Sequence, residues 1–164
     1  MMNMGSAMWL GSEKLKLFES SRNDDYVIII GCGRLGANLA NMLSNIGANV
    51  LIMDESRESF RRLDSNYGGL TVVGSGTDFD KLREAQIDRA SAVIAVTNDD
   101  NTNIMVAQIA RELFSVKKVI ARLHDPECEV VYQELGIETI CPAVLSAKEI
   151  DKMLDNFQLT EVSE

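Results

Sequence analysis

Three glycines at the end of an apolar run constrain this chain more than any other feature. The run at residues 26–30 is followed by Gly31, Gly33 and Gly36 in the spacing G-x-G-x-x-G. This pattern predicts a buried strand, a tight turn and the start of a helix. Gly31 would permit the turn, Gly33 would let a pyrophosphate approach the backbone, and Gly36 would let the helix lie close to the strand.

The residues after the glycines predict a βαβ unit that ends in an acid. Apolar side chains recur at helical spacing, at Leu35, Leu39, Met42, Leu43 and Ile46. Gly47 is placed to end this helix, and residues 50–53 predict a second buried strand. Asp54 comes next, eighteen positions after Gly36, where a dinucleotide-binding fold has the acid that binds the adenosine ribose. The alternative is that Asp54 only caps the next helix.

The glycine turn has the chemistry of a phosphate site. Free N–H groups and the helix dipole favour an anion at a helix N-terminus. Arg34 would add a permanent cation with fork-shaped donors, unless it is only a solvated residue of the first turn. Cys32 is expected to be a small residue that fills the turn rather than a redox-sensitive thiol. An acid at position 54 would repel a 2′-phosphate. The nearby cations Arg57, Arg61 and Arg62 would attract one, so the sequence leaves both kinds of ribose open.

Composition narrows the classes of function. A chain of 164 residues is long enough for one domain with a core, and too short for a cofactor domain plus a full catalytic domain. The formal net charge of −9 argues against binding to nucleic acid. The apolar runs are far shorter than a membrane span requires, so we expect a soluble chain. Cys32, Cys128, Cys141 and the one histidine, His124, have no zinc-ligand spacing, and a reducing cytoplasm suits these cysteines.

Strands and helices alternate along the rest of the chain. Further strands are predicted at residues 70–73, 92–96, within 116–123 and at 138–141. Helices are predicted over 56–67, after a cap at Thr77, over about 101–114, after Asp125-Pro126, and from a capping box at 146–149. The fold class is therefore α/β: a Rossmann-like, doubly wound, mostly parallel six-stranded sheet with helices on both faces.

This interpretation divides the chain into three parts. Residues 1–24 have no sustained period and predict a flexible N-terminal tail. Residues 25–142 form the Rossmann-like nucleotide-binding domain, and residues 143–164 form a C-terminal amphipathic helix and tail.

The carboxyl ends of the predicted strands should share one ligand-binding rim. The loops that meet there are 31–34, Asp54, 74–78, 97–103 and 122–125. Asp99 and Asp100 are expected to cap and start their helix. His124, the only candidate imidazole base, would lie near the ligand or in a surface turn. The sequence has no nucleophile elbow, no metal-ligand cluster and no Walker loop, so we expect a binding rim without catalytic or metal-ligating residues.

Two predicted helices have more apolar surface than a single sheet contact needs. The helix from about residue 101 is apolar over much of its circumference, which suggests a subunit interface. The last helix carries Ile150, Met153, Leu154 and Phe157 on one stripe. This stripe would pack back on its own domain or cross to a partner.

Six motifs in order resemble one known family, the nucleotide-binding RCK domain, also called the K-transport nucleotide-binding or TrkA-N domain. The match covers about residues 24–158. The motifs are Ile-Gly-Cys-Gly-Arg-Leu-Gly at 30–36, Met-Asp at 53–54, Val-Gly-Ser-Gly-Thr-Asp at 73–78 with Leu82, Thr-Asn-Asp-Asp-Asn-Thr-Asn at 97–103, Ile-Ala-Arg at 120–122 with Asp125-Pro126, and Leu-Gly-Ile at 135–137 with Cys141-Pro142.

The resemblance implies a cytoplasmic regulatory subunit of a Trk/Ktr-type potassium uptake system, peripheral to the inner face of the cell membrane. It implies binding of an adenine nucleotide (AMP, ADP, ATP or NAD(H)), assembly as a homodimer or larger ring, and an integral-membrane potassium transporter or channel as partner. By matching position, the glycine turn and Arg34 would meet phosphate, Asp54 the ribose, residues 74–76 the adenine, and Thr97 and Asn103 the far side of the nucleotide. The final helix resembles the family's crossover helix, which contributes to dimerisation.

The full set of predicted nucleotide contacts includes the neighbours of these residues. It comprises Gly31, Cys32, Gly33, Arg34, Leu35, Gly36, Asp54, Glu55, Gly74, Ser75, Gly76, Thr97, Asn98 and Asn103.

Two departures from the family pattern bear on function. The family usually has Gly-Asp-Ala where this chain has Gly74-Ser75-Gly76, so an acid near the adenine is missing. The sequence also ends after the crossover helix, without the smaller C-terminal subdomain of many relatives, so no second regulatory site is expected there. The alternative functions are the cofactor domain of an NAD-dependent oxidoreductase and a stand-alone adenine-nucleotide sensor for another partner.

Overall fold

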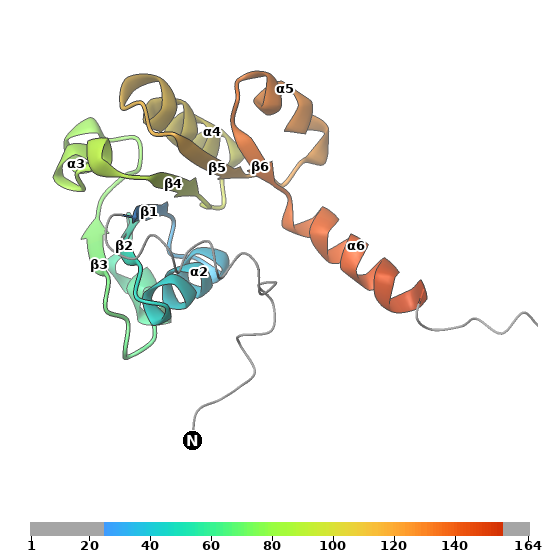
Figure 1. The fold of residues 1–164 in the computed structure, drawn as a ribbon, viewed down its shortest axis with the longest axis horizontal. Helices are drawn as coiled ribbons and strands as arrows, with labels where there is room; N and C mark the ends of the chain where they lie inside the picture. Colours follow the sequence, from blue (N-terminus) through green and yellow to red (C-terminus); the bar gives the residue numbers. More distant parts are fainter. Residues whose placement is uncertain (1–24, 156–164) are drawn as a thin grey trace, which may run out of the picture.

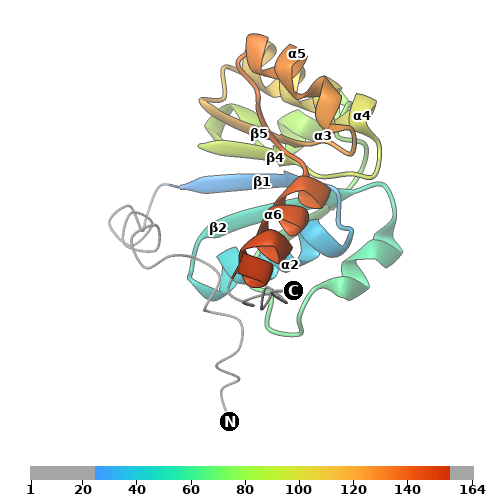
Figure 2. The same cartoon turned by 90° about the vertical axis from the view of Figure 1, so that its right-hand side faces the viewer.

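Six strands form one parallel sheet in the computed structural model, which describes residues 25–155 (Figure 1). They are β1 (Tyr26–Ile30), β2 (Asn49–Asp54), β3 (Leu70–Val73), β4 (Ala92–Ala95), β5 (Lys118–Arg122) and β6 (Glu138–Ile140). Their order in the sheet is β3-β2-β1-β4-β5-β6, and every neighbouring pair is parallel. Figure 2 shows β2, β1, β4 and β5 following one another across the sheet. The predicted fold class is confirmed.

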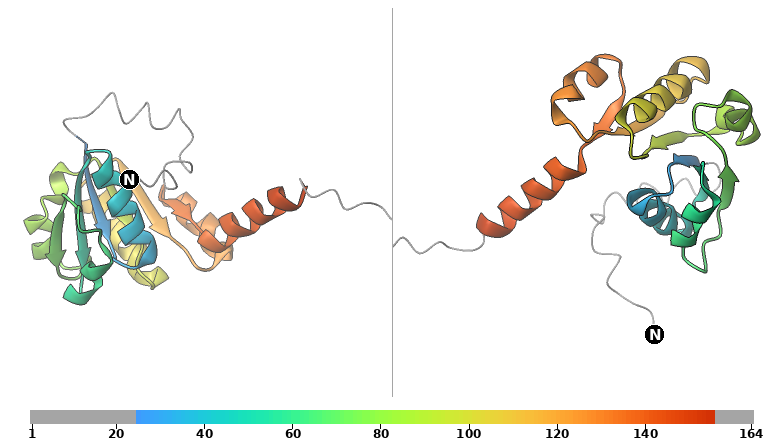
Figure 3. Two further views of the ribbon diagram at one scale, coloured as in Figure 1. Left: turned by 90° about the horizontal axis from the view of Figure 1, so that it is seen from below. Right: turned by 180° about the vertical axis from the view of Figure 1, so that it is seen from behind.

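Helices cover both faces of the sheet because the chain winds outward from β1 in two directions. On one face lies α2 (Arg34–Asn45), and on the other lie α3 (Phe79–Glu84), α4 (Asp100–Gln108) and α5 (Glu129–Glu134) (Figure 1). Short helical turns join them: η2 (Arg57–Arg62), η3 (Ile87–Arg89), η4 (Ile109–Leu113) and η5 (Pro126–Cys128). The last helix, α6 (Pro142–Asp155), leads away from the sheet (Figure 3).

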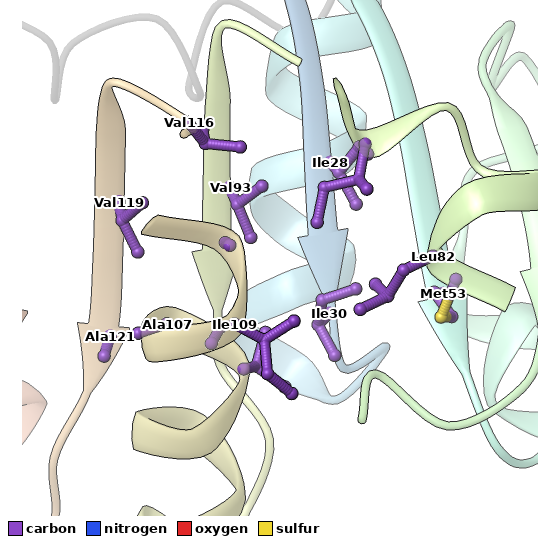
Figure 4. Packing of buried hydrophobic residues seen from close by; sticks show 14 of the residues in the cluster. Ile28, Ile30, Met53, Leu82, Val93, Ala107, Ile109, Val116, Val119 and Ala121 are labelled. Carbon is purple, nitrogen blue, oxygen red and sulfur yellow. The ribbon is translucent and has the colours of Figure 1, made fainter. Parts of the chain in front are cut away.

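Alternating side chains of β1 divide the core into two layers. Ile28 and Ile30 face α3 and α4, where they join Met53, Val93 and other buried residues of the larger cluster (Figure 4). Val27 and Ile29 face α2 in the smaller cluster. Both sides of the strand are buried because β1 is central and helices lie on both faces. Each fully buried isoleucine contributes about 1.5–3 kcal/mol to folding.

The start of α2 lies very close to the turn that precedes it. A Cβ at Gly36 would overlap the carbonyl oxygen of Gly31, so only glycine fits without a shift of the backbone. The buried side of α2 continues with Ala37, Ala40 and Leu43. The sequence pattern also placed Ile46 on the apolar stripe of this helix. That part of the prediction is wrong, because Ile46 follows the last turn and is 40% exposed. Small residues occupy the first turns on the buried side of α2 because the helix approaches the sheet closely there.

Three predicted helix boundaries are wrong. The helix predicted over residues 56–67 is only the short turn η2, because the chain becomes extended at Leu63. The cap of α3 is Asp78 and not Thr77: its Oδ1 accepts hydrogen bonds from the N–H groups of Asp80 and Lys81. The last helix does not begin at the predicted capping box, since α6 starts four residues earlier at Pro142, and proline favours the first turn.

Other parts of the predicted organisation agree with the structure or lie outside it. Asp99 caps α4, Asp125 caps η5 with proline in the first turn, and Gly47 and Gly136 end helices with positive φ. The helix predicted over about 101–114 is α4 followed by the π-helical turn η4. The predicted tail at residues 1–24, together with Phe157 and the chain end, lies outside the described residues.

Among residues 25–155, no helix combines the length and the apolar composition needed to cross a membrane.

Two glycines of the same turn should respond differently to an added methyl group. We expect Gly36→Ala to lower the free energy of unfolding by about 3 kcal/mol or more, because the new Cβ meets the backbone of Gly31. Gly33→Ala is the matched control, since a Cβ at Gly33 would meet nothing within 4 Å and φ is −77°. Its unfolding free energy should change by less than about 1 kcal/mol. Urea unfolding of the three proteins measures both, and equal losses would contradict the close approach.

Candidate functional site

A cleft lies at the carboxyl ends of β1, β2, β3 and β4, where four of the five segments of the predicted rim meet; the fifth, residues 122–125, does not line it. Its volume is about 350 Å³, within the range of small-molecule sites. The residues that line it are Ile30, Gly31, Gly33, Met53, Asp54, Glu55, Ser59, Arg62, Gly74, Gly76, Thr97, Asn98, Asp99 and Thr102.

The glycine turn forms the floor of the cleft. Gly31 has a φ of +104°, its N–H donates to the carbonyl of Met53 at 2.8 Å, and a Cβ there would meet the N atom of Thr97. Gly33 caps α2 with extended backbone and makes no side-chain cap. Because a Cβ at Gly33 would meet nothing within 4 Å, a ligand can approach the first turn of α2 from this side. This turn presents N–H groups and the positive end of the helix dipole.

Asp54 connects the glycine turn to the end of β2. Its Oδ2 accepts a hydrogen bond from the N–H of Cys32 at 2.7 Å, and its Oδ1 accepts one from the N–H of Ser56 at 2.8 Å. A carboxylate offers about four acceptor positions, so further donors such as ribose hydroxyls can still bind. Asp54 therefore holds the glycine turn as well as the turn that follows β2.

Cys32 fills the space under the turn. It is fully buried, and its thiol donates to the carbonyl of Ser59 at 3.4 Å. Burial and, second, the charge of Asp54 raise the pKa of Cys32 to about 11, against a smaller opposing effect of Arg62. The thiol therefore stays protonated at neutral pH and has the chemistry of a packing residue.

The loop after β3 forms a second wall of the cleft. Gly74 donates its N–H to the carbonyl of Asp54 at 3.0 Å, which holds the two strand ends together. A Cβ at Gly76 would meet the side chains of Ile30 and Val106, so the backbone lies directly on the core. Ser75 does not line the cleft, and its hydroxyl hydrogen-bonds with that of Thr77 at 3.0 Å.

The loop after β4 forms the wall opposite. Thr97, Asn98 and Asp99 line the cleft, and Asp99 caps α4 by accepting from the N–H of Thr102 at 2.7 Å. Hydrogen bonds from the Thr102 hydroxyl and N–H lower the pKa of Asp99. Asn103, one residue further along α4, is buried beneath the cleft and is not part of its lining.

Eight of the fourteen predicted contacts line the cleft, and the structure places the other six around or beneath it. Arg34 is exposed at the first position of α2, and Leu35 and Gly36 belong to the packing of that helix. The predicted residues outside the lining are Cys32, Arg34, Leu35, Gly36, Ser75 and Asn103.

The lining also contains six residues that are not among the predicted contacts: Ile30, Met53, Ser59, Arg62, Asp99 and Thr102. Ile30 is the last residue of β1 and Met53 precedes Asp54, the last residue of β2. The strand pattern in the sequence therefore indicates that both lie at the cleft. Arg62 lies on η2 and is one of the three arginines that the sequence offered for a phosphorylated ribose, whereas no sequence pattern marks Ser59 on the same turn. Thr102 was identifiable only as the partner of the Asp99 cap.

His124 is half-exposed and bound to the start of α4 rather than to the cleft. Its Nδ1 lies 2.6 Å from Oδ1 of Asp100, and its N–H donates to the same carboxylate. Burial alone would raise the pKa of Asp100, but the hydrogen bonds from His124 and Asp125 lower it overall. Within the described residues, no group of three His, Cys, Asp or Glu side chains could hold a metal ion.

The comparison with a family model decides which family these features represent. The model of the TrkA-N domain matches residues 27–142. This chain belongs to the TrkA-N domain family. The resemblance deduced from the six motifs is confirmed.

Several TrkA-N relatives are similar to this chain over most of its length. The Trk system potassium uptake protein TrkA of Streptomyces coelicolor is 46% identical over 129 residues, which are 79% of this chain and 56% of that protein. The chain thus spans about half the length of the curated relatives it matches. The structure of GsuK bound to ADP is 27% identical with a TM-score of 0.70, over 86% of this chain and 36% of GsuK. The GsuK channel bound to NAD is 28% identical with a TM-score of 0.71, over 83% and 24%.

The carboxylate of Asp100 should make stability depend on acid pH. A pKa lowered by folding stabilises the protein above the ordinary aspartate pKa of about 4, and this contribution is lost as the pH falls through the folded-state pKa. We expect Asp100→Asn to be less stable than the wild type at pH 7, and the difference to shrink towards about pH 2. Urea unfolding across this pH range measures it. A difference that stays constant with pH would contradict the role of the charged carboxylate.

Proposed function

We propose that this TrkA-N chain is the cytoplasmic nucleotide-binding part of a regulatory subunit that controls a membrane potassium transporter or channel. In this role the chain regulates transport and does not act as an oxidoreductase or another enzyme. The observation that carries it is the cleft in which the open first turn of α2 faces Asp54 and the loops after β3 and β4. The similarity to TrkA of Streptomyces coelicolor supports the link to potassium uptake.

The proposed ligand is an adenine nucleotide: AMP, ADP, ATP or NAD(H). Its phosphates would lie at Gly33 and the first turn of α2, where free N–H groups and the helix dipole favour an anion. Arg34, exposed beside this turn, would approach the phosphates from solvent. The ribose hydroxyls would bind Asp54, and the base would lie towards Gly74 and Gly76. The ADP and NAD in the GsuK structures support this class of ligand.

The charges at the ribose end favour an unphosphorylated ribose. Asp54 lies at the end of β2 and would repel a 2′-phosphate, and Glu55 lines the cleft next to it. Arg62 is the cation of the lining on this side. With two carboxylates against one guanidinium, NAD(H) is expected to bind more tightly than NADP(H).

The proposed assembly is a homodimer or a larger ring that uses α6. Four apolar side chains of this helix are at least half exposed: Leu145, Ile150, Met153 and Leu154. Both views of Figure 3 show α6 projecting from the domain. Ile150, Met153 and Leu154 lie on one stripe of the helix, whereas Leu145 lies outside it, and an apolar stripe of this kind is stabilised when a second copy covers it. Val130, Val131 and Leu135 of α5 and its C-cap add exposed apolar surface that a second interface would bury.

The proposed mechanism is a shift between two arrangements of the assembled subunits. A nucleotide that binds one arrangement more tightly raises the population of that arrangement. The membrane transporter, bound to the assembly at the inner face of the membrane, would sense the change. Co-purification with the membrane subunit of a potassium transporter distinguishes this function from that of a sensor for another partner.

Calorimetric titration with AMP, ADP, ATP, NAD, NADH and NADPH tests the ligand. We expect at least one adenine nucleotide to bind, and Asp54→Ala and Gly33→Ala to weaken binding by about tenfold or more, because one loses ribose hydrogen bonds and the other blocks the phosphates. Arg34→Ala should weaken binding of nucleotides with more phosphates. Asp88→Ala is the control, since it removes the same charge from η3, at the other end of the sheet. Absence of binding by every nucleotide would contradict the proposal.

Sedimentation velocity tests the assembly. We expect the wild-type protein to form dimers or larger species, and Ile150→Glu to shift it to monomers, because a charge would have to be buried at the interface. Lys148→Glu is the control, because 100° per residue puts it on the other side of the helix. A wild-type monomer, or equal behaviour of the two variants, would contradict the use of α6.

A further inference from the structure

Asn103 uses its whole side-chain amide inside the protein. It is fully buried in the first turns of α4. Its Oδ1 accepts from the N–H of Thr97 at 2.8 Å and from the Thr97 hydroxyl at 2.7 Å. Its Nδ2 donates to the carbonyls of Thr97 at 3.2 Å and Arg122 at 3.1 Å. These four bonds match the two donors and two acceptor positions of an amide, so none is left for a ligand.

The residue that Asn103 holds forms part of the cleft. Thr97 begins the loop after β4 and lines the site. Its N atom lies 2.9 Å from the position of a Cβ on Gly31, so the loop touches the glycine turn. The preceding residue, Val96, donates its N–H to the carbonyl of Ile30 at 2.8 Å. The position of Thr97 therefore determines how far this wall stands from the phosphate turn.

Asn103 also connects this wall to the next strand. The carbonyl of Arg122 is the last of β5, and the bond from Asn103 to it joins the ends of β4 and β5. Without this amide, the N–H and carbonyl of Thr97 and the carbonyl of Arg122 would each lose a partner, whereas the Thr97 hydroxyl would keep its contacts with the backbone of Asp99 at 3.2 Å. The cost of such unpaired groups favours a rearrangement of the loop.

We propose that Asn103 is a positioning residue of the nucleotide site, which acts through Thr97 and does not touch the nucleotide. The inference rests on the proposed function, because it assigns a role in the same cleft. It replaces the sequence-based expectation that Asn103 binds the far side of the nucleotide. The alternative is that Asn103 contributes to stability alone, as any buried, hydrogen-bonded amide does.

A second buried asparagine provides the matched control. Asn41 lies in α2, is 8% exposed, and its Oδ1 accepts from the N–H of Asp64 at 3.0 Å. This bond ties a helix to a loop, as the bonds of Asn103 do, but neither Asn41 nor Asp64 lines the cleft. Asn41→Leu and Asn103→Leu each remove a buried amide from a helix. Both should lower the melting temperature, whereas only the second should change the binding of a nucleotide.

The experiment measures ADP affinity by calorimetry at a temperature where circular dichroism shows each variant to be folded. We expect Asn103→Leu to weaken binding by about tenfold and Asn41→Leu to change it by less than about twofold. Asn103→Thr is the second variant, because its hydroxyl can bond to the carbonyl one helical turn back and leaves no unpaired side-chain group. It should fold where Asn103→Leu does not, and it should show the same loss of affinity.

A double-mutant cycle tests whether Asn103 acts through Thr97. Thr97→Val removes the hydroxyl, which bonds to Asn103 and also to the backbone of Asp99, and keeps the shape of the side chain. If the two residues act as one unit, the double variant loses less affinity than the product of the single losses. Independent losses, or wild-type affinity in both Asn103 variants, would overturn the positioning role and leave nucleotide binding intact. A wild-type protein that binds no adenine nucleotide would overturn both proposals.

Discussion

The close approach of α2 to the glycine turn is the contact on which the rest of the structure depends. The backbone of Gly36 lies against the carbonyl of Gly31, and this is possible only without a side chain at position 36. The contact directs the N-terminus of α2 to the end of β1. The same turn is held by Asp54, which accepts the N–H of Cys32, and by the loop that begins at Thr97. The cleft exists because three strand ends converge on one turn.

The first turn of α4 organises the opposite side of the cleft in a similar way. Three polar side chains serve different segments: Asp99 caps the helix, Asp100 binds the backbone and ring of His124, and Asn103 joins Thr97 to the end of β5. The bonds to His124 and Arg122 connect segments that are distant in sequence. The loops after β4 and β5 therefore form one hydrogen-bonded unit. A movement of the cleft wall would displace the end of β5 as well.

The α6 helix differs from α2 in which of its side chains are buried. The other long helix, α2, buries its small residues against the sheet, whereas α6 leaves its largest apolar residues exposed. A single chain gains little from such a helix, because its apolar area remains in water. The proposed regulator would combine a well-packed domain with an exposed apolar helix that a second copy covers.

The sequence by itself determined the strand–turn–helix unit, the six-stranded α/β fold and the position of Asp54, because all three depend on short-range spacing of glycines and apolar residues. The sequence was a weaker guide to helix starts, because neighbouring residues can each begin the same helix. The N-cap of α3 is Asp78 and not Thr77, and α6 begins at Pro142 and not at Ser146. The tertiary structure alone decided that Ser59 lines the cleft, that Arg62 does so and Arg57 and Arg61 do not, and that Asn103 lies beneath it. Those positions depend on which strand ends become neighbours across β1, and no pattern within one segment records that arrangement.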